Sequence, residues 1–284
     1  MKQHISKMPH RKADTHKGSF GHVFVLAGSL GLTGAAYLSS QAAIRSGSGL
    51  VTCGIPESLN AIMEIKLLEV MTLPLPETKD RSFACSALEK ILKFSEQINC
   101  LALGPGISRN KETQRLSREV IKKINTPLVL DADGIIAIAE IPDILKKRKS
   151  PSVLTPHPGE MARLLGKATA YVQGNRVSVA QKFAKKYKSI VVLKGYRTVV
   201  TSPGGETYVN ETGNSGMSTA GAGDVLTGMI ASFIGQGMEP YSASVIGVYL
   251  HGKAGDLAAR DIGQFGMIAG DILKKLPEAI KEVV

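Results

Sequence analysis

The chain has 284 residues, 43% of them hydrophobic and 21% charged, and its 35 basic and 24 acidic side chains give a net charge of +11. This length suits one large α/β domain with a sizeable core. No stretch approaches the roughly 20 apolar residues needed to cross a bilayer, and the basic, polar residues 1–17 lack the apolar centre of a secretory signal. Three widely spaced cysteines favour a reducing compartment over a disulfide framework. We therefore expect a cytoplasmic protein that has no membrane partner.

Strand and helix signals alternate along the first half of the chain. Short apolar runs predict strands at residues 22–27, 50–54, 67–75, 100–103 and 127–130. Helical signals fall between them, at residues 34–46, 86–97 and 112–123. A short helix is expected after Asp133.

The second half continues this alternation and ends in helices. Strands are expected at residues 152–154 and 190–193, and helices from Glu160 and at residues 171–187. Residues 198–201 and 207–210 predict a hairpin, and the chain from Asp224 onward is expected to be helical. The pattern predicts an α/β protein with a mainly parallel central sheet covered by helices on both faces. Because we see no linker or repeat, we expect a single domain over residues 1–284, with residues 1–10 flexible.

Glycine and polar residues follow five of the predicted strands. Because the carboxyl ends of parallel strands meet at one edge of a sheet, where ligands bind in open α/β folds, these residues predict an active site. The five segments are Gly28-Ser29, Gly104-Pro105-Gly106, Asp131-Ala132-Asp133, the loop around His157, and Lys194-Gly195.

A loop of small residues leads into the helix that begins near Asp224. Gly221, Ala222 and Gly223 would let an anion approach the backbone, and a helix N-terminus offers free N–H groups and the positive end of its dipole. An aspartate at this position could take a proton from a hydroxyl that attacks a phosphoryl group. An ordinary aspartate near a helix N-cap would give the same local sequence.

The first predicted strand and turn carry Gly28, Gly31 and Gly34, a G-x-x-G-x-x-G spacing. Dinucleotide-binding folds use G-x-G-x-x-G and an acidic residue at the end of the second strand. The second strand here ends in Cys53-Gly54-Ile55-Pro56-Glu57, which matches poorly. We therefore do not interpret this turn as a Rossmann motif.

Three other residues allow both a functional and a structural interpretation. His157 lies between two prolines in a rigid loop, where it could contact a phosphate or sugar, or simply be solvated. Lys194 ends an apolar strand, where it could meet a phosphate or extend to the solvent at an edge. Glu160 could serve only as a helix cap.

Taken together, these motifs resemble the ADP-dependent (S)-NAD(P)H-hydrate dehydratase family of the ribokinase-like superfamily. The resemblance covers about residues 11–280, and the joint occurrence of T-P-H-P-G-E and the segment ending in Gly-Asp is highly specific. The segments that carry it are Lys17-Gly18-x-x-Gly21, Ala27-Gly28-Ser29, Gly104-Pro105-Gly106, Leu130-Asp131-Ala132-Asp133, residues 155–160, Lys194-Gly195 and residues 214–228.

The resemblance implies a ribokinase-like three-layer α/β/α fold and a hydro-lyase activity. Such an enzyme repairs NADHX and NADPHX, the hydrated forms of NADH and NADPH, by acting on the S epimer. ADP would be the phosphoryl donor, with ATP as a second candidate, and AMP and phosphate the by-products. Mg²⁺ would accompany the nucleotide. Many members carry a preceding epimerase domain, but the pattern here begins by about residue 11, so we expect a stand-alone dehydratase that works with a separate epimerase.

The resemblance also assigns site residues. Asp224 would be the catalytic base, with an anion hole formed by Gly221, Ala222 and Gly223, and no protein metal ligands are implied. Contacts to the hydrated cofactor would come from Ala43, Gly106, His157 and Asp224. The adenine nucleotide would be held by Lys194, Gly195, Tyr196, Arg197, Thr198 and Gly223. The family usually has a glycine where this chain has Ala220 or Ala222, and an alanine fits there if its φ is negative.

The expected mechanism joins phosphoryl transfer to elimination. Asp224 would take the proton of the carbon-6 hydroxyl as this group attacks the β-phosphoryl of ADP. The amides of residues 221–223 would stabilise the transferring charge, and Mg²⁺ would neutralise the nucleotide phosphates. Phosphate would then leave, pushed by the ring nitrogen.

Two other functions remain open at this stage. A vitamin-precursor kinase of the hydroxyethylthiazole or hydroxymethylpyrimidine type would share the fold and the Gly-Asp loop, but the His157 loop argues against it. A basic nucleic-acid-binding protein is the second alternative. Only 5% of residues are aromatic, none is tryptophan, and the Lys and Arg residues lie mostly on mixed helical segments. We therefore expect an anionic small-molecule substrate and no nucleic acid.

Relatives in the family are often tetramers, which implies a homotetramer. Small residues in the C-terminal helical region could pack against a neighbouring subunit. These are Ala243, Ser244, Gly247, Gly252, Ala254 and Gly255.

Overall fold

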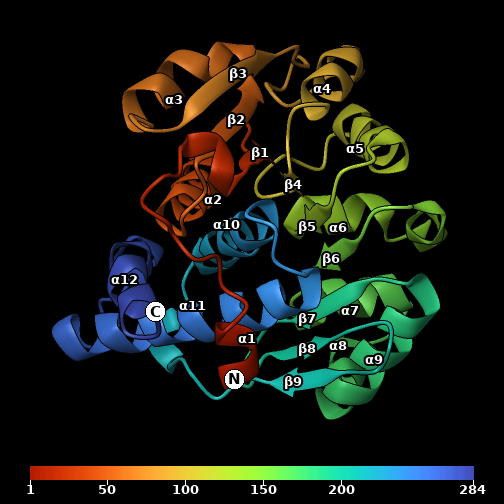
Figure 1. The fold of residues 1–284 in the computed structure, drawn as a ribbon. Coiled ribbons are helices and arrows are strands. Elements are labelled where there is room, and N and C mark those ends of the chain that lie inside the picture. Colours follow the sequence, from red (N-terminus) through yellow and green to blue (C-terminus); the bar gives the residue numbers. More distant parts are fainter.

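A nine-stranded sheet forms the centre of the molecule (Figure 1). The computed structural model describes residues 1–284 except for the side chain of Lys2. The strand order is β3-β2-β1-β4-β5-β6-β7-β8-β9. Strands β1 to β7 are all parallel to their neighbours in this order, and β8 and β9 add an antiparallel edge. The strands are β1 (His22–Leu26), β2 (Leu50–Pro56), β3 (Met71–Leu75), β4 (Cys100–Leu103), β5 (Leu128–Leu130), β6 (Ser152–Leu154), β7 (Ile190–Leu193), β8 (Val199–Thr201) and β9 (Thr207–Val209).

Helices cover both faces of this sheet, which confirms the three-layer α/β/α prediction (Figure 1). One layer contains α2, α3, α10, α11 and α12, and the other contains α4 to α9. The helices are α1 (Lys2–Ile5), α2 (Thr33–Arg45), α3 (Asn60–Lys66), α4 (Leu88–Ser95), α5 (Lys111–Lys123), α6 (Ala132–Ile138), α7 (Pro158–Leu165), α8 (Thr169–Gly174), α9 (Arg176–Tyr187), α10 (Ala222–Gly235), α11 (Pro240–Ile262) and α12 (Ala269–Lys281).

The apolar strands feed two hydrophobic cores, one on each face of the sheet. In β1, Val23 and Val25 belong to the core beneath α2 and α10, whereas Phe24 and Leu26 belong to the core on the opposite face. Successive strand residues point to opposite faces, so a strand that is covered on both faces must be apolar throughout. This explains why the strands read as continuous apolar runs.

Three elements differ from the sequence predictions. The helix expected at residues 171–187 is interrupted where Asn175 leaves the helical geometry, with φ −134°, so that α8 and α9 are separate. Helix α3 was not expected, and β3 begins only at Met71. At the N-terminus, α1 packs on α11, and the buried ring of His4 lies 3.2 Å from the Ser242 hydroxyl.

The small residues of α11 pack inside the chain, which corrects the expectation that they contact a neighbouring subunit. Gly247 lies against Ile230 of α10, and Gly255 lies against Met217. A Cβ atom on Gly252 would fall 2.2 Å from the hydroxyl oxygen of Thr212. These positions are therefore small because α10 and the loop before it approach α11 closely.

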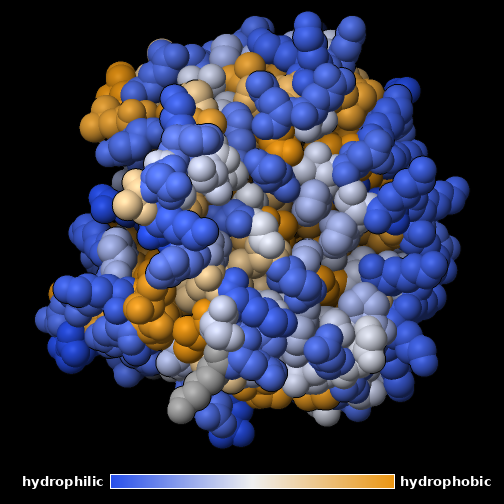
Figure 2. All heavy atoms as spheres, in the orientation of Figure 1, coloured by the Kyte–Doolittle hydropathy of each residue, from blue (hydrophilic) through white to orange (hydrophobic). Residues whose placement is uncertain are grey.

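The molecular surface is mostly hydrophilic, with a gathering of apolar atoms over α3 at the upper left of Figure 2. The most exposed apolar side chains on and after α3 are Ile65 (79%) and Leu68 (83%). Throughout the described residues, every helix is too short or too polar to span a membrane. Cys53, Cys85 and Cys100 are free thiols.

Candidate active site

The loops that follow the parallel strands are joined to one another by hydrogen bonds. The amide of Gly28 donates to the carbonyl of Pro105 at 2.8 Å, and the hydroxyl of Ser29 donates to the carbonyl of Gly106 at 2.8 Å. Farther along the same edge, the amide of Lys194 donates to the carbonyl of Pro156 at 2.9 Å. The structure thus brings the carboxyl ends of β1, β4, β6 and β7 together, as the sequence predicted.

Gly104 allows the loop after β4 to lie directly on the end of β5. Its φ is +129°, and a Cβ atom there would fall 1.9 Å from the carbonyl oxygen of Asp131. Only glycine suits this conformation and this close approach. The neighbouring Ala132 is held at φ +46°, an uncommon value for a residue with a side chain. The backbone around Asp131 is therefore tightly constrained at the edge where ligands would bind.

The buried carboxylate of Asp131 forms an ion pair at this edge with Lys194, which is partly exposed. The Nζ atom of Lys194 donates to Oδ1 of Asp131 at 2.6 Å, and the hydroxyl of Thr227 in α10 donates to Oδ2 at 2.8 Å. Burial disfavours the charge on Lys194, but the carboxylates of Asp131 and Glu160 outweigh burial and raise its pKa. Lys194 therefore keeps its charge. The sequence singled out Lys194 but did not identify Asp131 and Thr227 as its supports.

The first turn of α10 lies open beside this pair. Gly221 precedes the helix with φ +89°, and no side chain caps the helix N-terminus among the described residues. A Cβ atom on Gly223 would lie 3.0 Å from Nζ of Lys194, so the ammonium group packs against the helix backbone. Ala220 and Ala222 are absent from the described residues that have positive φ. The alanine in this loop is therefore free of backbone strain.

Asp224 lies half-buried on that first turn. Burial raises its pKa to about 7, the nearby carboxylate of Asp131 acts in the same direction, and Lys194 opposes both. A carboxyl group with a pKa near neutrality is well suited to accept a proton from an attacking hydroxyl. The electrostatics of the site thus agree with the role expected for Asp224.

His157 is held in one orientation by the first turn of α7. Its Nδ1 accepts from the amides of Gly159 (3.0 Å) and Glu160 (3.3 Å), so the neutral ring carries its proton on Nε2. In return, Oε2 of Glu160 accepts from the His157 amide at 2.8 Å. Burial lowers the pKa of His157, as does Lys194, and burial raises that of Glu160 to about 7. Glu160 is therefore a helix cap, as one interpretation held, and it also fixes the His157 ring.

A cavity of about 640 Å³ lies between the start of α10, α11 and the turn after β7. It brings together five of the six residues expected to hold the nucleotide, and it also includes His157 and Ala222. The sixth, Arg197, is exposed at the tip of the turn with φ +53°. The residues that line the cavity include His157, Lys194, Gly195, Tyr196, Thr198, Thr212, Met217, Ala222, Gly223, Leu226, Val248, His251 and Gly252.

The residues expected to contact the substrate are not all together. Asp224 is not among the residues that line the cavity, but it directly follows Gly223, which is. Gly106 faces the start of α2, where a Cβ atom would come within 3.0 Å of Ala35. Ala43 is fully buried in the core beneath α2. Its contact with the substrate stays a prediction.

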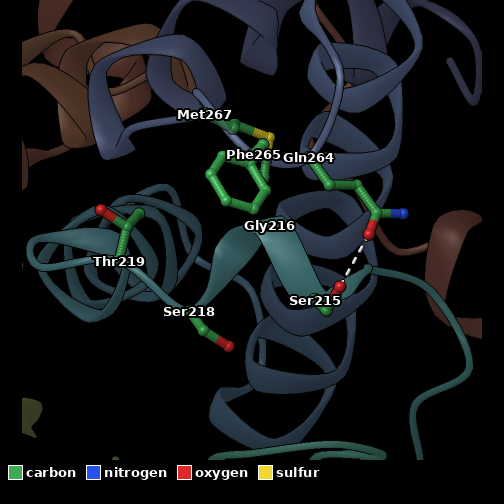
Figure 3. Close-up of a pocket in the computed structure, with 7 residues that line it drawn as sticks. All are labelled: Ser215, Gly216, Ser218, Thr219, Gln264, Phe265 and Met267. Carbon is green, nitrogen blue, oxygen red and sulfur yellow. Dashed lines mark hydrogen bonds between the residues drawn. The ribbon is translucent and has the colours of Figure 1, made fainter.

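A second cavity, of about 400 Å³, adjoins the first through Ser215, Ser218 and Thr219. Figure 3 shows the segment from Ser215 to Thr219 facing Gln264, Phe265 and Met267 across it. The hydroxyl of Ser215 donates to Oε1 of Gln264 at 2.7 Å, which ties the two walls together. Sequence reasoning did not single out Phe265, whose side chain is fully exposed.

The charges at this edge suit a cation that arrives with a ligand. In the part of the chain that the structure describes, no group of three or more His, Cys, Asp or Glu side chains is arranged to hold a metal ion. Yet the carboxylates of Asp131, Glu160 and Asp224 all act on Lys194, and Asp133 nearby pairs with Arg109 at 3.5 Å. Repulsion from the other three carboxylates contributes to the raised pKa of Asp224. Mg²⁺ commonly binds through one or two carboxylates, water and substrate phosphates. The donor set therefore fits a magnesium–nucleotide complex better than a fixed metal centre.

Comparisons with known proteins point to one family. The family model described as NAD(P)H-hydrate dehydratase matches residues 23–278. A bifunctional NAD(P)H-hydrate repair enzyme of Moorella thermoacetica is 46% identical over 278 residues, which cover 98% of this chain and 52% of that enzyme. An ADP-dependent (S)-NAD(P)H-hydrate dehydratase of Neisseria meningitidis is 36% identical, covering 96% of this chain and 90% of that one. The chain thus spans about half the length of the bifunctional relatives it matches.

Solved structures agree with this result. The ADP/ATP-dependent NAD(P)H-hydrate dehydratase of Bacillus subtilis, co-crystallised with ATP and Mg²⁺, superposes with a TM-score of 0.86 at 30% identity and covers 100% of this chain and 98% of that one. A ribokinase of Thermotoga maritima reaches a TM-score of 0.56 at 17% identity, over 93% and 99% of the two chains, and shares the fold alone. The ribokinase-like fold expected from the sequence is confirmed.

Proposed function

Because this chain belongs to the NAD(P)H-hydrate dehydratase family, we propose that it dehydrates the S epimers of NADHX and NADPHX to NADH and NADPH, with ADP as the phosphoryl donor. The observation that carries the proposal is Asp224, which lies on the uncapped first turn of α10 beside a cavity of about 640 Å³. The activity named for the Neisseria relative supports the same reaction. ATP is a second candidate donor, because a relative was co-crystallised with it.

The first step is phosphoryl transfer to the substrate. The carboxylate of Asp224 takes the proton of the carbon-6 hydroxyl while the oxygen of that hydroxyl attacks the β-phosphorus of ADP. The bond between that phosphorus and the bridging oxygen breaks, and AMP leaves. Amides of the first turn of α10 and the ammonium of Lys194 face the transferring group and stabilise its charge.

The second step is elimination of phosphate. Hydroxide is a poor leaving group, whereas phosphate can leave carbon 6 with the bonding electrons. The lone pair of the ring nitrogen pushes it out, and loss of a proton from the adjacent ring carbon completes the dihydronicotinamide. We propose that His157, which lies in the cavity lining with its proton on Nε2, donates to a phosphate oxygen of the bound substrate.

Mg²⁺ fits the excess of carboxylates at the site. We propose that the nucleotide phosphates bring it and that Asp131 and Asp133 hold it through water molecules. When bound, it would neutralise phosphate charge.

Recovery of near-ultraviolet dihydronicotinamide absorbance from an NADHX mixture tests the function. The assay contains Mg²⁺ and either ADP, ATP or no nucleotide. We expect recovery only with nucleotide, ending when the S epimer is used up, with release of AMP from ADP. An absence of recovery with both nucleotides would contradict the proposal and favour a vitamin-precursor kinase, which would instead accumulate a stable phosphorylated alcohol.

Assembly and location form a further part of the proposal. We propose a cytoplasmic homotetramer, with one ribokinase-like domain in residues 1–284, that does not bind nucleic acid. The apolar surface over α3, next to the edge strand β3, supports contact between subunits. Light scattering should give four times the chain mass, and Leu68→Lys should reduce that mass. A monomer in both cases would contradict the tetramer.

A further inference from the structure

His251 is a buried polar residue in the wall of the 640 Å³ cavity for which the mechanism has no role. His251 lies in α11 and is only 9% exposed, and its Nε2 atom has no hydrogen-bond partner. Among the described side chains, three other buried polar atoms share this condition, on Ser40, Ser46 and Asn60, and none of those residues lines the cavity. Buried polar atoms are nearly always paired, so an unpaired one that borders a ligand cavity calls for a partner.

The chemistry of the ring defines what that partner must be. Burial lowers the pKa of His251 to about 4, although a hydrogen bond to the backbone of Ala222 opposes this effect. The ring is therefore neutral near pH 7, with one N–H group and one bare lone pair. The bond to Ala222 raises the pKa of His251, so the ring donates it to the backbone carbonyl. Because Nε2 has no partner, we infer that Nδ1 carries the N–H group. Nε2 then carries the lone pair and needs a donor.

The surroundings of His251 match one end of a nucleotide. Leu226 and Val248 supply apolar contacts in the cavity lining, which suit a flat base. On another side, Lys194 and the first turn of α10 are suited to phosphates. A nucleotide that spans these two regions would carry its base and ribose past α11. Both of those groups contain hydrogen-bond donors.

We propose that Nε2 of His251 accepts a hydrogen bond from a donor of the bound adenine nucleotide, either the exocyclic amine of adenine or a ribose hydroxyl. This inference rests on the proposed function only in that the cavity holds a nucleotide. This hydrogen bond would make His251 a residue that discriminates between nucleotides. A nucleotide with an acceptor opposite Nε2 would leave two lone pairs facing each other. Such a ligand binds more weakly.

Two substitutions distinguish the contributions of the two ring nitrogens of His251 to nucleotide binding. His251→Asn keeps an N–H group near the position of Nδ1 and removes the acceptor at Nε2. His251→Gln places an amide oxygen near the position of Nε2. By isothermal titration calorimetry, we expect the asparagine variant to bind ADP about tenfold more weakly than the wild type, and the glutamine variant to recover most of that loss.

Nucleotide analogues identify the donor and keep the test independent of any folding defect. IDP has a carbonyl in place of the exocyclic amine, and 2′-deoxy-ADP and 3′-deoxy-ADP each lack one hydroxyl. Wild-type protein should bind one of the three about tenfold more weakly than it binds ADP. For that analogue alone, His251→Asn should cause no further loss. Equal wild-type affinity for ADP and all three analogues would overturn the proposal.

Ser244→Ala is the matched control on the same helix. Ser244 is fully buried, its hydroxyl donates to the carbonyl of Pro240 at 2.7 Å, and it does not line the cavity. This variant should lose stability and keep its ADP affinity. A uniform loss of affinity for ADP and every analogue in His251→Asn would indicate a merely structural role and overturn the proposal. Failure of wild-type protein to bind ADP or ATP would overturn the proposed function as well.

Discussion

Helices α10 and α11 pack side by side on the same face of the sheet, but they begin in opposite ways. Helix α11 starts with Pro240, and the carboxylate of Glu239 accepts from the amides of Tyr241 and Ser242, both at 2.8 Å. Helix α10 starts after Gly221 without any side-chain cap in the described structure. One N-terminus is thus closed by its own sequence, and the other is left open.

The difference separates stability from function. A capped N-terminus satisfies the free amides of the first turn and stabilises the fold. An uncapped one gives up that stabilisation and keeps its amides and dipole available to an anion. Of these two helices, only α10 carries a carboxyl group with a pKa near neutrality, that of Asp224. Substitutions at the two ends should therefore affect different properties.

The largest effect is expected for Asp224→Asn. Removing the base should lower kcat about 10²- to 10⁴-fold, because asparagine cannot accept the proton of the attacking hydroxyl. Nucleotide affinity should stay within about threefold of the wild-type value, because the amides of α10 and Lys194 remain. Steady-state kinetics and calorimetry measure the two quantities. Wild-type turnover by this variant would remove Asp224 from the mechanism.

The pH dependence of the wild-type enzyme should follow the same group. The pKa of Asp224 is raised to about 7, so the carboxylate that acts as base is lost as the pH falls below 7. We expect kcat/KM to fall about 50-fold between pH 7 and pH 5, with a slope that approaches about tenfold per pH unit at the acidic end. The residual activity of Asp224→Asn should lack this dependence. A flat wild-type profile across this range would argue against a titrating base.

The raised pKa also predicts a stability difference. The folded state binds this proton more tightly than the unfolded state, where a free aspartate has a pKa of about 3.9. Ionising Asp224 in the folded protein therefore lowers the free energy of unfolding. This loss is absent below about pH 4, grows as the pH rises, and is complete above pH 7. At pH 8, Asp224→Asn should increase the free energy of unfolding by roughly 1–2 kcal/mol. Urea unfolding at pH 8 and pH 4 should show this gain only at the higher pH.

Gly223→Ala tests how closely Lys194 must approach the open helix end. A Cβ atom would come within 3.0 Å of Nζ, so the ammonium must shift away from the transferring phosphoryl. We expect kcat/KM to fall about 10- to 100-fold with little loss of stability. Gly174→Ala is a matched control, because an added Cβ atom there meets no heavy atom within 4 Å. Equal activities of the two variants would contradict the role given to this contact.

The smallest effect on activity is expected at the closed helix end. Glu239→Ala removes two cap hydrogen bonds and should lower the free energy of unfolding by about 1 kcal/mol. Its kcat/KM should equal that of the wild type, since Glu239 lies outside both described cavities. Thermal unfolding and the dehydration assay measure the two quantities. A large loss of activity would mean that the two helix ends are coupled, contrary to the comparison.

Local sequence signals sufficed for the fold and for the edge where the site lies. Apolar runs that end in glycine or polar residues gave nearly every strand, and the segment of small residues before Asp224 gave the open helix. The sequence did not reveal which residues far apart in the chain contact one another. Asp131 meets Lys194 63 positions away and Thr227 96 positions away, because the order of the strands brings them together.

The expectation for α11 failed for the same physical reason. Its small residues gave no indication of which side of the helix would be buried, and the packing of α11 on α10 and on the loop before it decides this point. His251 escaped notice because a single histidine in an apolar helix is usually a core residue. Only the unpaired Nε2 beside a cavity distinguishes it.

The fate of the substrate oxygen is the most direct test of the central claim, that the hydroxyl at carbon 6 is phosphorylated before it leaves. NADHX prepared in ¹⁸O-water carries the label in this hydroxyl. Mass spectrometry of the phosphate released during turnover with ADP should find one ¹⁸O atom per phosphate. Unlabelled phosphate, with the label recovered in water, would show that the hydroxyl leaves without phosphoryl transfer and would contradict the account.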